Sequence, residues 1–124
     1  MAKFFFLILV YDVVMALSQV FLKMGADKIT FSGFSGFKST LTFIYQILRQ
    51  PYILLGIFFM VSSFFLWMYV ISKIKLGIAF PLTAFIYVLV AIFSYFVLAE
   101  KLELINYFGI LSIIIGVALL LYKA

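Results

Sequence analysis

The sequence contains no cysteine and no histidine among its 124 residues. Without these residues the chain forms no disulfide, carries out no thiol chemistry and lacks the ligands of most zinc sites. It also lacks the side chain that most often carries protons near neutral pH. The sequence shows no nucleophile–base pair, metal-ligand cluster or glycine-rich phosphate loop. We therefore expect no enzymatic activity, no metal and no cofactor.

Charged residues are also scarce, at 10% of the chain, whereas 69% of the residues are hydrophobic. A soluble domain of this size cannot hide so much apolar surface, because small domains have too much surface for their volume. Four long, mostly apolar runs each approach the ~20 residues that a membrane-spanning helix needs. The predicted fold is therefore one all-α integral membrane domain over residues 1–124, with spans at residues 4–22, 52–71, 77–99 and 104–122.

A fifth helix, over residues 39–50, is predicted to lie in the membrane interface. Leu41, Ile44, Tyr45 and Leu48 share one helical face, whereas Arg49 does not. This amphipathic pattern is typical of helices that bury one face at the boundary of the bilayer.

The basic residues are divided almost equally between the two predicted sides of the membrane. The formal net charge of +5 is attributed to lysines that anchor helix ends, so no nucleic acid partner is expected. One side carries Lys3, Lys73, Lys75 and Lys123, and the other carries Lys23, Lys28, Lys38, Arg49 and Lys101. Because an excess of basic residues normally sets orientation, this balance allows either dual topology or a single orientation fixed by other factors.

Asp12 is the only acidic residue within a predicted span. It follows Lys3 by nine residues, or roughly 13 Å at ~1.5 Å per residue, which is near the middle of the hydrocarbon layer. Ionisable groups at that depth are costly and usually functional, so Asp12 is a candidate binding site for a proton or cation. Alternatively, the helix starts later and Asp12 is a passive polar residue nearer the interface.

Other polar residues could extend this site. Gln19 and Lys23 share a helical face with Asp12, and Ser18 is adjacent. In the third span, Thr83 and Tyr87 are four residues apart and could line a cavity. The alternatives are that these groups hydrogen-bond to neighbouring helices and that Lys23 extends to the headgroups.

Small residues form a stripe on the last span, at Gly109, Ser112 and Gly116. Such stripes let two helix backbones approach closely in lipid. They indicate a packing or dimerisation face.

Several short motifs resemble the four-helix transporters of the drug/metabolite superfamily, which includes EamA-like proteins. They are ALSQVFLK at residues 16–23, KLGIAFP at 75–81, EKLE at 100–103, and the glycines seven apart at 109 and 116. The small multidrug resistance family, whose members are dimers that exchange cations for protons, shares the glycine pair. It differs at Met15, where that family keeps a membrane glutamate, and at Thr83, where it has an aromatic residue.

A closer resemblance is to the paired four-helix flippase subunits that move undecaprenyl-phosphate-linked aminoarabinose across the inner membrane. It rests on Ser18 and Gln19 followed by Lys23, and on Phe80-Pro81 in the third span. It implies a multi-pass protein of a bacterial or archaeal inner membrane. The chain would pair either with a second copy, which could run antiparallel, or with a similar four-helix subunit.

The resemblance and the polar residues together favour a flippase for a lipid-linked sugar. Lys23 and Arg49 would attract the phosphate headgroup, the sugar would hydrogen-bond to Gln19, Ser18, Thr83 and Tyr87, and Asp12 would hold an amine or a proton. Two alternatives remain. One is a proton-coupled exporter of cationic compounds that uses Asp12, and the other is a non-transporting subunit of a larger membrane enzyme.

Overall fold

The computed structural model describes residues 2–30 and 36–122, and this part of the chain is all-helical. Four helical segments are long and apolar enough to cross a membrane, the third being Leu76–Val97. This confirms the predicted all-α membrane fold, with a short extra helix between the first two spans. The helices are α1 (Ala2–Ala26), α2 (Phe37–Arg49), α3 (Pro51–Ile71), α4 (Leu76–Leu82), α5 (Phe85–Val97) and α6 (Leu104–Tyr122).

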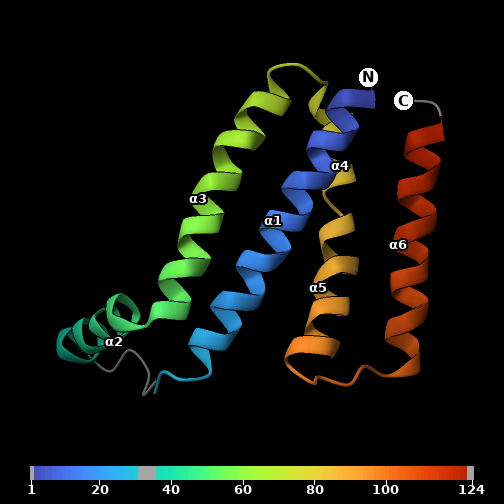
Figure 1. The fold of residues 1–124 in the computed structure, drawn as a ribbon. Coiled ribbons are helices and arrows are strands. Elements are labelled where there is room, and N and C mark those ends of the chain that lie inside the picture. Colours follow the sequence, from blue (N-terminus) through green and yellow to red (C-terminus); the bar gives the residue numbers. More distant parts are fainter. Residues whose placement is uncertain (1, 31–35, 123–124) are drawn as a thin grey trace.

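The spans lie side by side in the order α3, α1, the α4–α5 segment and α6 (Figure 1). α1 packs most extensively against α3 and next against α5, whereas α6 packs mainly along α5 and α4. The start of α1, the α3–α4 turn and the end of α6 lie at one end of the bundle (Figure 1). α2 and the α5–α6 loop lie at the other end. Lys123, which the sequence places near the start of α1, is outside the described residues.

Two glycines allow α1 and α3 to approach closely. A Cβ atom added to Gly56 of α3 would lie 2.7 Å from the Cγ atom of Leu22 and 3.0 Å from the backbone oxygen of Ser18. A Cβ atom added to Gly25 of α1 would overlap the side chain of Ile53. Contacts this short would force the helices apart, so glycine is required at both positions.

A small apolar core joins three spans at the end of the bundle where α1 begins. Its buried residues come from α1, from α4, and from the end of α3 with the turn that follows it. α6 contributes only partly buried residues, Val117 and Leu120, which pack against this core, and none of its residues is fully buried. The core residues are Ile8, Val70, Ile74, Ala79 and Leu82.

The third span is not the single helix predicted over residues 77–99, because α4 ends at Leu82 and α5 begins at Phe85. The amides of Thr83 and Ala84 bond to carbonyls three residues earlier, at 3.0 Å each, rather than four residues earlier. Proline has no amide hydrogen, and its ring crowds the carbonyl one turn before it. Pro81 lies inside α4, one residue before its end, and the regular helix stops directly after it, at Thr83 and Ala84.

The short helix α2 begins at Phe37 and ends at Arg49, close to the predicted range of 39–50. Its apolar stripe is exposed and includes Leu41, Ile44, Tyr45 and Leu48, whereas Gln46 and Ile47 are partly covered. The apolar face of α2 therefore points away from the rest of the protein. This is the arrangement expected of a helix that lies in the membrane interface.

Candidate functional site

A cavity of about 500 Å³ lies between α1 and the break between α4 and α5, and Gln19, Thr83 and Tyr87 all line it. The structure therefore brings together three of the polar residues that the sequence singles out. Met15, the position where the multidrug resistance family keeps its glutamate, lines the same cavity. Polar groups that converge in a mostly apolar cavity are the usual form of a small-molecule site.

The break in the third span decides how Thr83 and Tyr87 are presented. Thr83 lies in the turn between α4 and α5, where its hydroxyl donates to the backbone carbonyl of Phe80. The oxygen of that hydroxyl keeps acceptor capacity for a ligand. Tyr87 lies in the first turn of α5 and its side chain is 67% exposed. Gln19 adds an amide that can both donate and accept.

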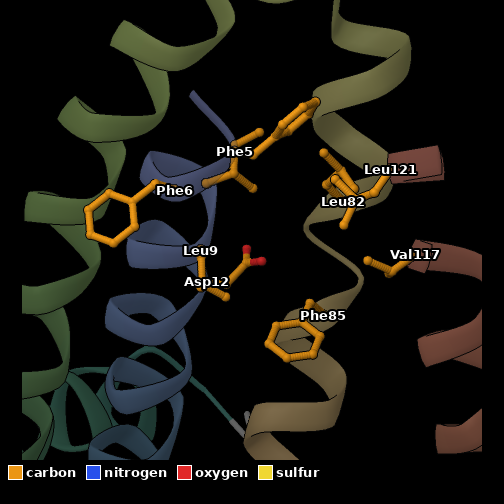
Figure 2. Close-up of a pocket in the computed structure, with 9 residues that line it drawn as sticks. Phe5, Phe6, Leu9, Asp12, Leu82, Phe85, Val117 and Leu121 are labelled. Carbon is orange, nitrogen blue, oxygen red and sulfur yellow. The ribbon is translucent and has the colours of Figure 1, made fainter. Parts of the chain in front are cut away.

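Asp12 lines a different cavity, of about 300 Å³, which is bordered by α1, the α4–α5 segment and α6. Figure 2 shows its carboxylate pointing from α1 into this space. The other residues that line the cavity are all apolar, and none of them also lines the Gln19 cavity. The predicted continuous stripe of Asp12 and Gln19 is therefore divided between two cavities.

The environment of Asp12 is unusual for a carboxylate. Its side chain is only 1% exposed, and within the described residues its Oδ1 atom has no hydrogen-bond partner. Among the described residues, the cavity walls near it include Phe85 and Leu82 but no cation. Because a buried charge normally has a partner, this site favours a positively charged or proton-donating ligand.

Ser18 does not contribute to either cavity, contrary to the predicted role in substrate binding. Its side chain is fully buried, and its hydroxyl donates to the backbone carbonyl of Gly56 at 2.7 Å. The alternative interpretation, a hydrogen bond to a neighbouring helix, is therefore the correct one for this residue.

Lys23 and Arg49 both lie at the α2 end of the bundle, but their partners differ. The Lys23 ammonium pairs with the Asp27 carboxylate at 3.0 Å, and both side chains are about half exposed. Arg49 donates to the hydroxyl of Tyr45 at 2.8 Å. The charge of Lys23 is thus partly neutralised by Asp27. Arg49 keeps its full charge, because the Tyr45 hydroxyl that it contacts is neutral.

A model of the EamA-like transporter family matches residues 3–122, which is nearly the whole chain. The chain belongs to the EamA-like transporter family. It is thus a multi-pass membrane protein of a transporter family, as the four apolar helices also indicate.

Three relatives of this EamA-like chain have the same name, probable 4-amino-4-deoxy-L-arabinose-phosphoundecaprenol flippase subunit ArnE. The protein of Pseudomonas fluorescens Pf0-1 is 31% identical over 72 residues, which are 58% of this chain and 63% of that protein. The protein of Pseudomonas fluorescens Pf-5 is 28% identical over 75 residues, or 60% and 66% of the two chains. That of Aeromonas hydrophila is 29% identical over 76 residues, or 61% and 67%.

The matched region therefore spans slightly less than two thirds of the two Pseudomonas proteins. No solved structure matches this chain. The relatives confirm the resemblance to flippase subunits of the drug/metabolite superfamily that the sequence motifs indicate.

The small-residue stripe of this EamA-like chain faces outward from the bundle. Gly109, Ser112 and Gly116 are exposed, and a Cβ atom at either glycine would meet no other atom within 4 Å. The Ser112 hydroxyl donates to the carbonyl of Phe108 in its own helix, at 3.0 Å. The stripe therefore packs against none of the other described helices, and dimerisation stays a prediction.

The sequence reasoning missed Asp27, whose pairing with Lys23 follows from their spacing of four residues on one helical face. It also missed Gly25 and Gly56 as packing positions. No sequence signal identifies Leu82 and Phe85 as walls of the Asp12 cavity, because that requires knowing how α1 sits against the third span.

Proposed function

We propose that the chain is a subunit of a flippase for a lipid-linked sugar in the bacterial or archaeal inner membrane. The observation that carries this proposal is the cavity of about 500 Å³ that Gln19, Thr83 and Tyr87 share. It offers hydrogen-bonding groups to a polar head at a depth where water is scarce. The lipid tail can stay in the bilayer throughout, so only the head needs a polar path.

The cavity is bordered by one chain and leaves Tyr87 exposed. A second four-helix subunit, either another copy or a similar chain, would close it. The relatives' printed name, flippase subunit, supports an assembly of this kind. The exposed Gly109, Ser112 and Gly116 stripe supplies a contact face for that partner.

At the α2 end of the bundle, Lys23 and Arg49 would attract the phosphate of the head before it enters the cavity. Asp12 would hold a cation in the neighbouring cavity, such as the amine of an amino sugar. Alternating exposure would come from movement of α1, α3 and the α4–α5 segment against α6. No covalent step is required.

The test is translocation of a fluorescent lipid-linked amino sugar in vesicles that hold the purified chain. We expect Gln19→Leu and Tyr87→Phe each to slow translocation at least about tenfold, since each leaves a polar head without a hydrogen bond in a dry site. The control is Ser62→Ala, because the exposed Ser62 hydroxyl bonds only within α3 in the described structure. Unchanged rates in both cavity variants would reject the proposal.

The same assay tests the alternative of an accessory subunit. An accessory subunit predicts no translocation by the chain alone and none after addition of a second four-helix subunit. The flippase proposal predicts that one of these two preparations is active.

A second candidate function, export of cationic compounds, is supported by the buried Asp12 carboxylate, whose Oδ1 atom has no hydrogen-bond partner among the described residues. It predicts that expression protects drug-sensitive cells from quaternary ammonium compounds and that Asp12→Asn removes this protection. Absence of any protection, with the chain shown to be present in the membrane, would eliminate this candidate.

A further inference from the structure

A third cavity, of about 260 Å³, lies where the residues after α1 meet the end of α2. Lys28, Tyr45, Gln46 and Arg49 all line it, and it shares no lining residue with the two cavities described above. It therefore lies outside the two cavities of the proposed passage, although Arg49 is also one of the basic residues proposed to attract the sugar phosphate.

The two cations of this cavity are oriented but not neutralised. The Lys28 ammonium lies 4.4 Å from the centre of the Tyr52 ring. The Arg49 guanidinium lies 5.5 Å from the centre of the Tyr45 ring and donates to the hydroxyl of that residue. Aromatic faces and hydroxyls hold cations in place without removing their charge.

The nearest acidic residue in the sequence does not neutralise these cations. Asp27 precedes Lys28 directly, but its carboxylate pairs with Lys23 at 3.0 Å. No other ion pair occurs within residues 2–30 and 36–122. The cavity therefore keeps a net positive charge and fits an anion.

Gln46 adds a second requirement. Its side-chain oxygen is buried, and it has no hydrogen-bond partner in the part of the chain that the structure describes. A buried acceptor normally receives a hydrogen bond. The matching ligand therefore carries a donor, such as a hydroxyl or an amine, beside its negative charge.

The position of α2 sets the depth of this cavity in the membrane. The apolar stripe of α2 is exposed, with Leu48 at 61% and Phe37 at 80%. A helix that buries such a stripe lies at the boundary of headgroups and acyl chains. A helix in that position would place Lys28 and Arg49 at the level of lipid phosphates.

We propose that this cavity binds the phosphodiester headgroup of a membrane phospholipid, with the phosphate between Lys28 and Arg49 and a headgroup hydroxyl donating to Gln46. Phosphatidylglycerol has this combination of charge and donor. The bound lipid would fix α2 against the start of α3. A phosphate-linked sugar offers the same chemistry, so the test includes a separate probe for that source.

The experiment measures lipid retained by the purified full chain, using native mass spectrometry in detergent with added lipids. Phosphatidylcholine lacks the net charge, and phosphatidylmethanol has the charge but no hydroxyl donor. We expect phosphatidylglycerol to be retained about tenfold over phosphatidylcholine, because each basic residue near a lipid phosphate strengthens binding. We expect it to exceed phosphatidylmethanol several-fold as well.

Two sets of variants separate the cavity from general charge attraction. The double variant Lys28→Gln, Arg49→Gln should lose the preference over phosphatidylcholine. The control Lys38→Gln, Lys101→Gln removes the same charge at the same end of the bundle, outside the cavity, and should keep it. Gln46→Leu should equalise phosphatidylglycerol and phosphatidylmethanol without lowering the retention of either below that of phosphatidylcholine. Circular dichroism verifies that each variant is folded.

Equal losses in the two double variants would overturn the proposal, because attraction would then be diffuse. A polyprenyl phosphate serves as the probe for the second source. If it is retained through Lys28 and Arg49 while phosphatidylglycerol is not, the cavity is a phosphate site, but the proposed phospholipid occupant is wrong. The occupant is then a lipid of the transported kind. If neither is retained, the proposal is wrong. Gln19→Leu should leave lipid retention unchanged, because Gln19 does not line this cavity. Failure of the flippase proposal, measured by translocation, is therefore distinguishable from failure of the lipid-binding proposal, measured by retention.

Discussion

The hydroxyl of Ser18 on α1 donates a hydrogen bond to the backbone carbonyl of Gly56 on α3, across 2.7 Å. The glycine makes this approach possible, because a Cβ atom there would lie 3.0 Å from the backbone oxygen of Ser18 itself. The two residues thus form one contact that depends on a missing side chain and a small hydroxyl. This contact joins α3 to α1, the helix that lines both the Asp12 and the Gln19 cavities.

Gly56→Ala should destabilise the fold. The added methyl group would also overlap Leu22, and overpacking of this kind costs about 1–3 kcal/mol. The measurement is thermal unfolding in detergent. Gly109→Ala is the matched control, because it is also a glycine in a helix but has open space around it. Equal effects of the two substitutions would contradict close packing at Gly56.

Ser18→Ala should lower stability without a direct effect on transport. Interhelical hydrogen bonds in membrane proteins contribute about 0.6 kcal/mol and at most about 1.7 kcal/mol. Ser62→Ala is the control, since that hydroxyl bonds to a carbonyl of its own helix at 2.9 Å. Transport should be measured per folded molecule. A loss of transport in a fully stable Ser18→Ala protein would restore the substrate role predicted from the sequence.

Asp12→Asn should make the protein more stable and less active. The substitution keeps the shape of the side chain but removes a charge that has no ion-pair partner in the described structure. Such a charge costs about 2.5–3.5 kcal/mol at the centre of a membrane span. Opposite effects on stability and activity are typical of functional groups held in unfavourable surroundings. Thermal unfolding and the vesicle assay measure the two effects.

The control for Asp12 is Asp27→Asn, which removes an exposed acid outside the cavities. It should leave stability within about 0.5 kcal/mol, as exposed ion pairs contribute little. If Asp12→Asn changes neither quantity, Asp12 is a passive residue.

Pro81→Ala should join α4 and α5 into a more regular helix. The restored amide can bond four residues back, which removes the cause of the break at Thr83 and Ala84. Hydrogen exchange at the amides of residues 83–87 should slow, and translocation should slow with it if the break shapes the Gln19 cavity. Pro51→Ala is the control, because Pro51 begins α3, where proline is tolerated. If hydrogen exchange at residues 83–87 does not change in Pro81→Ala, the break has another cause than Pro81.

Gly116→Leu should weaken a dimer that forms through the small-residue stripe of α6. The large side chain would hold two backbones apart, whereas in one isolated chain it meets open space. Cross-linking in membranes measures the dimer fraction, and monomer stability should not change. The control is Gly77→Leu on α4, which also has open space around it. If the variant keeps the full dimer fraction, the dimer interface does not lie on the small-residue stripe of α6.

The sequence itself determined the number of spans, the interfacial helix and the family. Bilayer thickness fixes the length of an apolar run, and the amphipathic period of residues 39–50 depends only on local order along the chain. It also singled out Gln19, Thr83 and Tyr87 as candidate polar residues, from their spacing along each helix and from the family resemblance. These features need no knowledge of which helix packs against which.

Only the tertiary structure decided which polar residues share a site. Asp12 and Gln19 lie on one face of α1, yet seven residues separate them by roughly 10 Å along the axis. The break after Pro81 then sends Leu82 and Phe85 to one cavity and Thr83 and Ala84 to the other. Helical periodicity fixes the direction of a side chain, but the neighbour it meets depends on contacts between helices far apart in the sequence. For the same reason, the bond from Ser18 to Gly56 could not be told from a substrate contact.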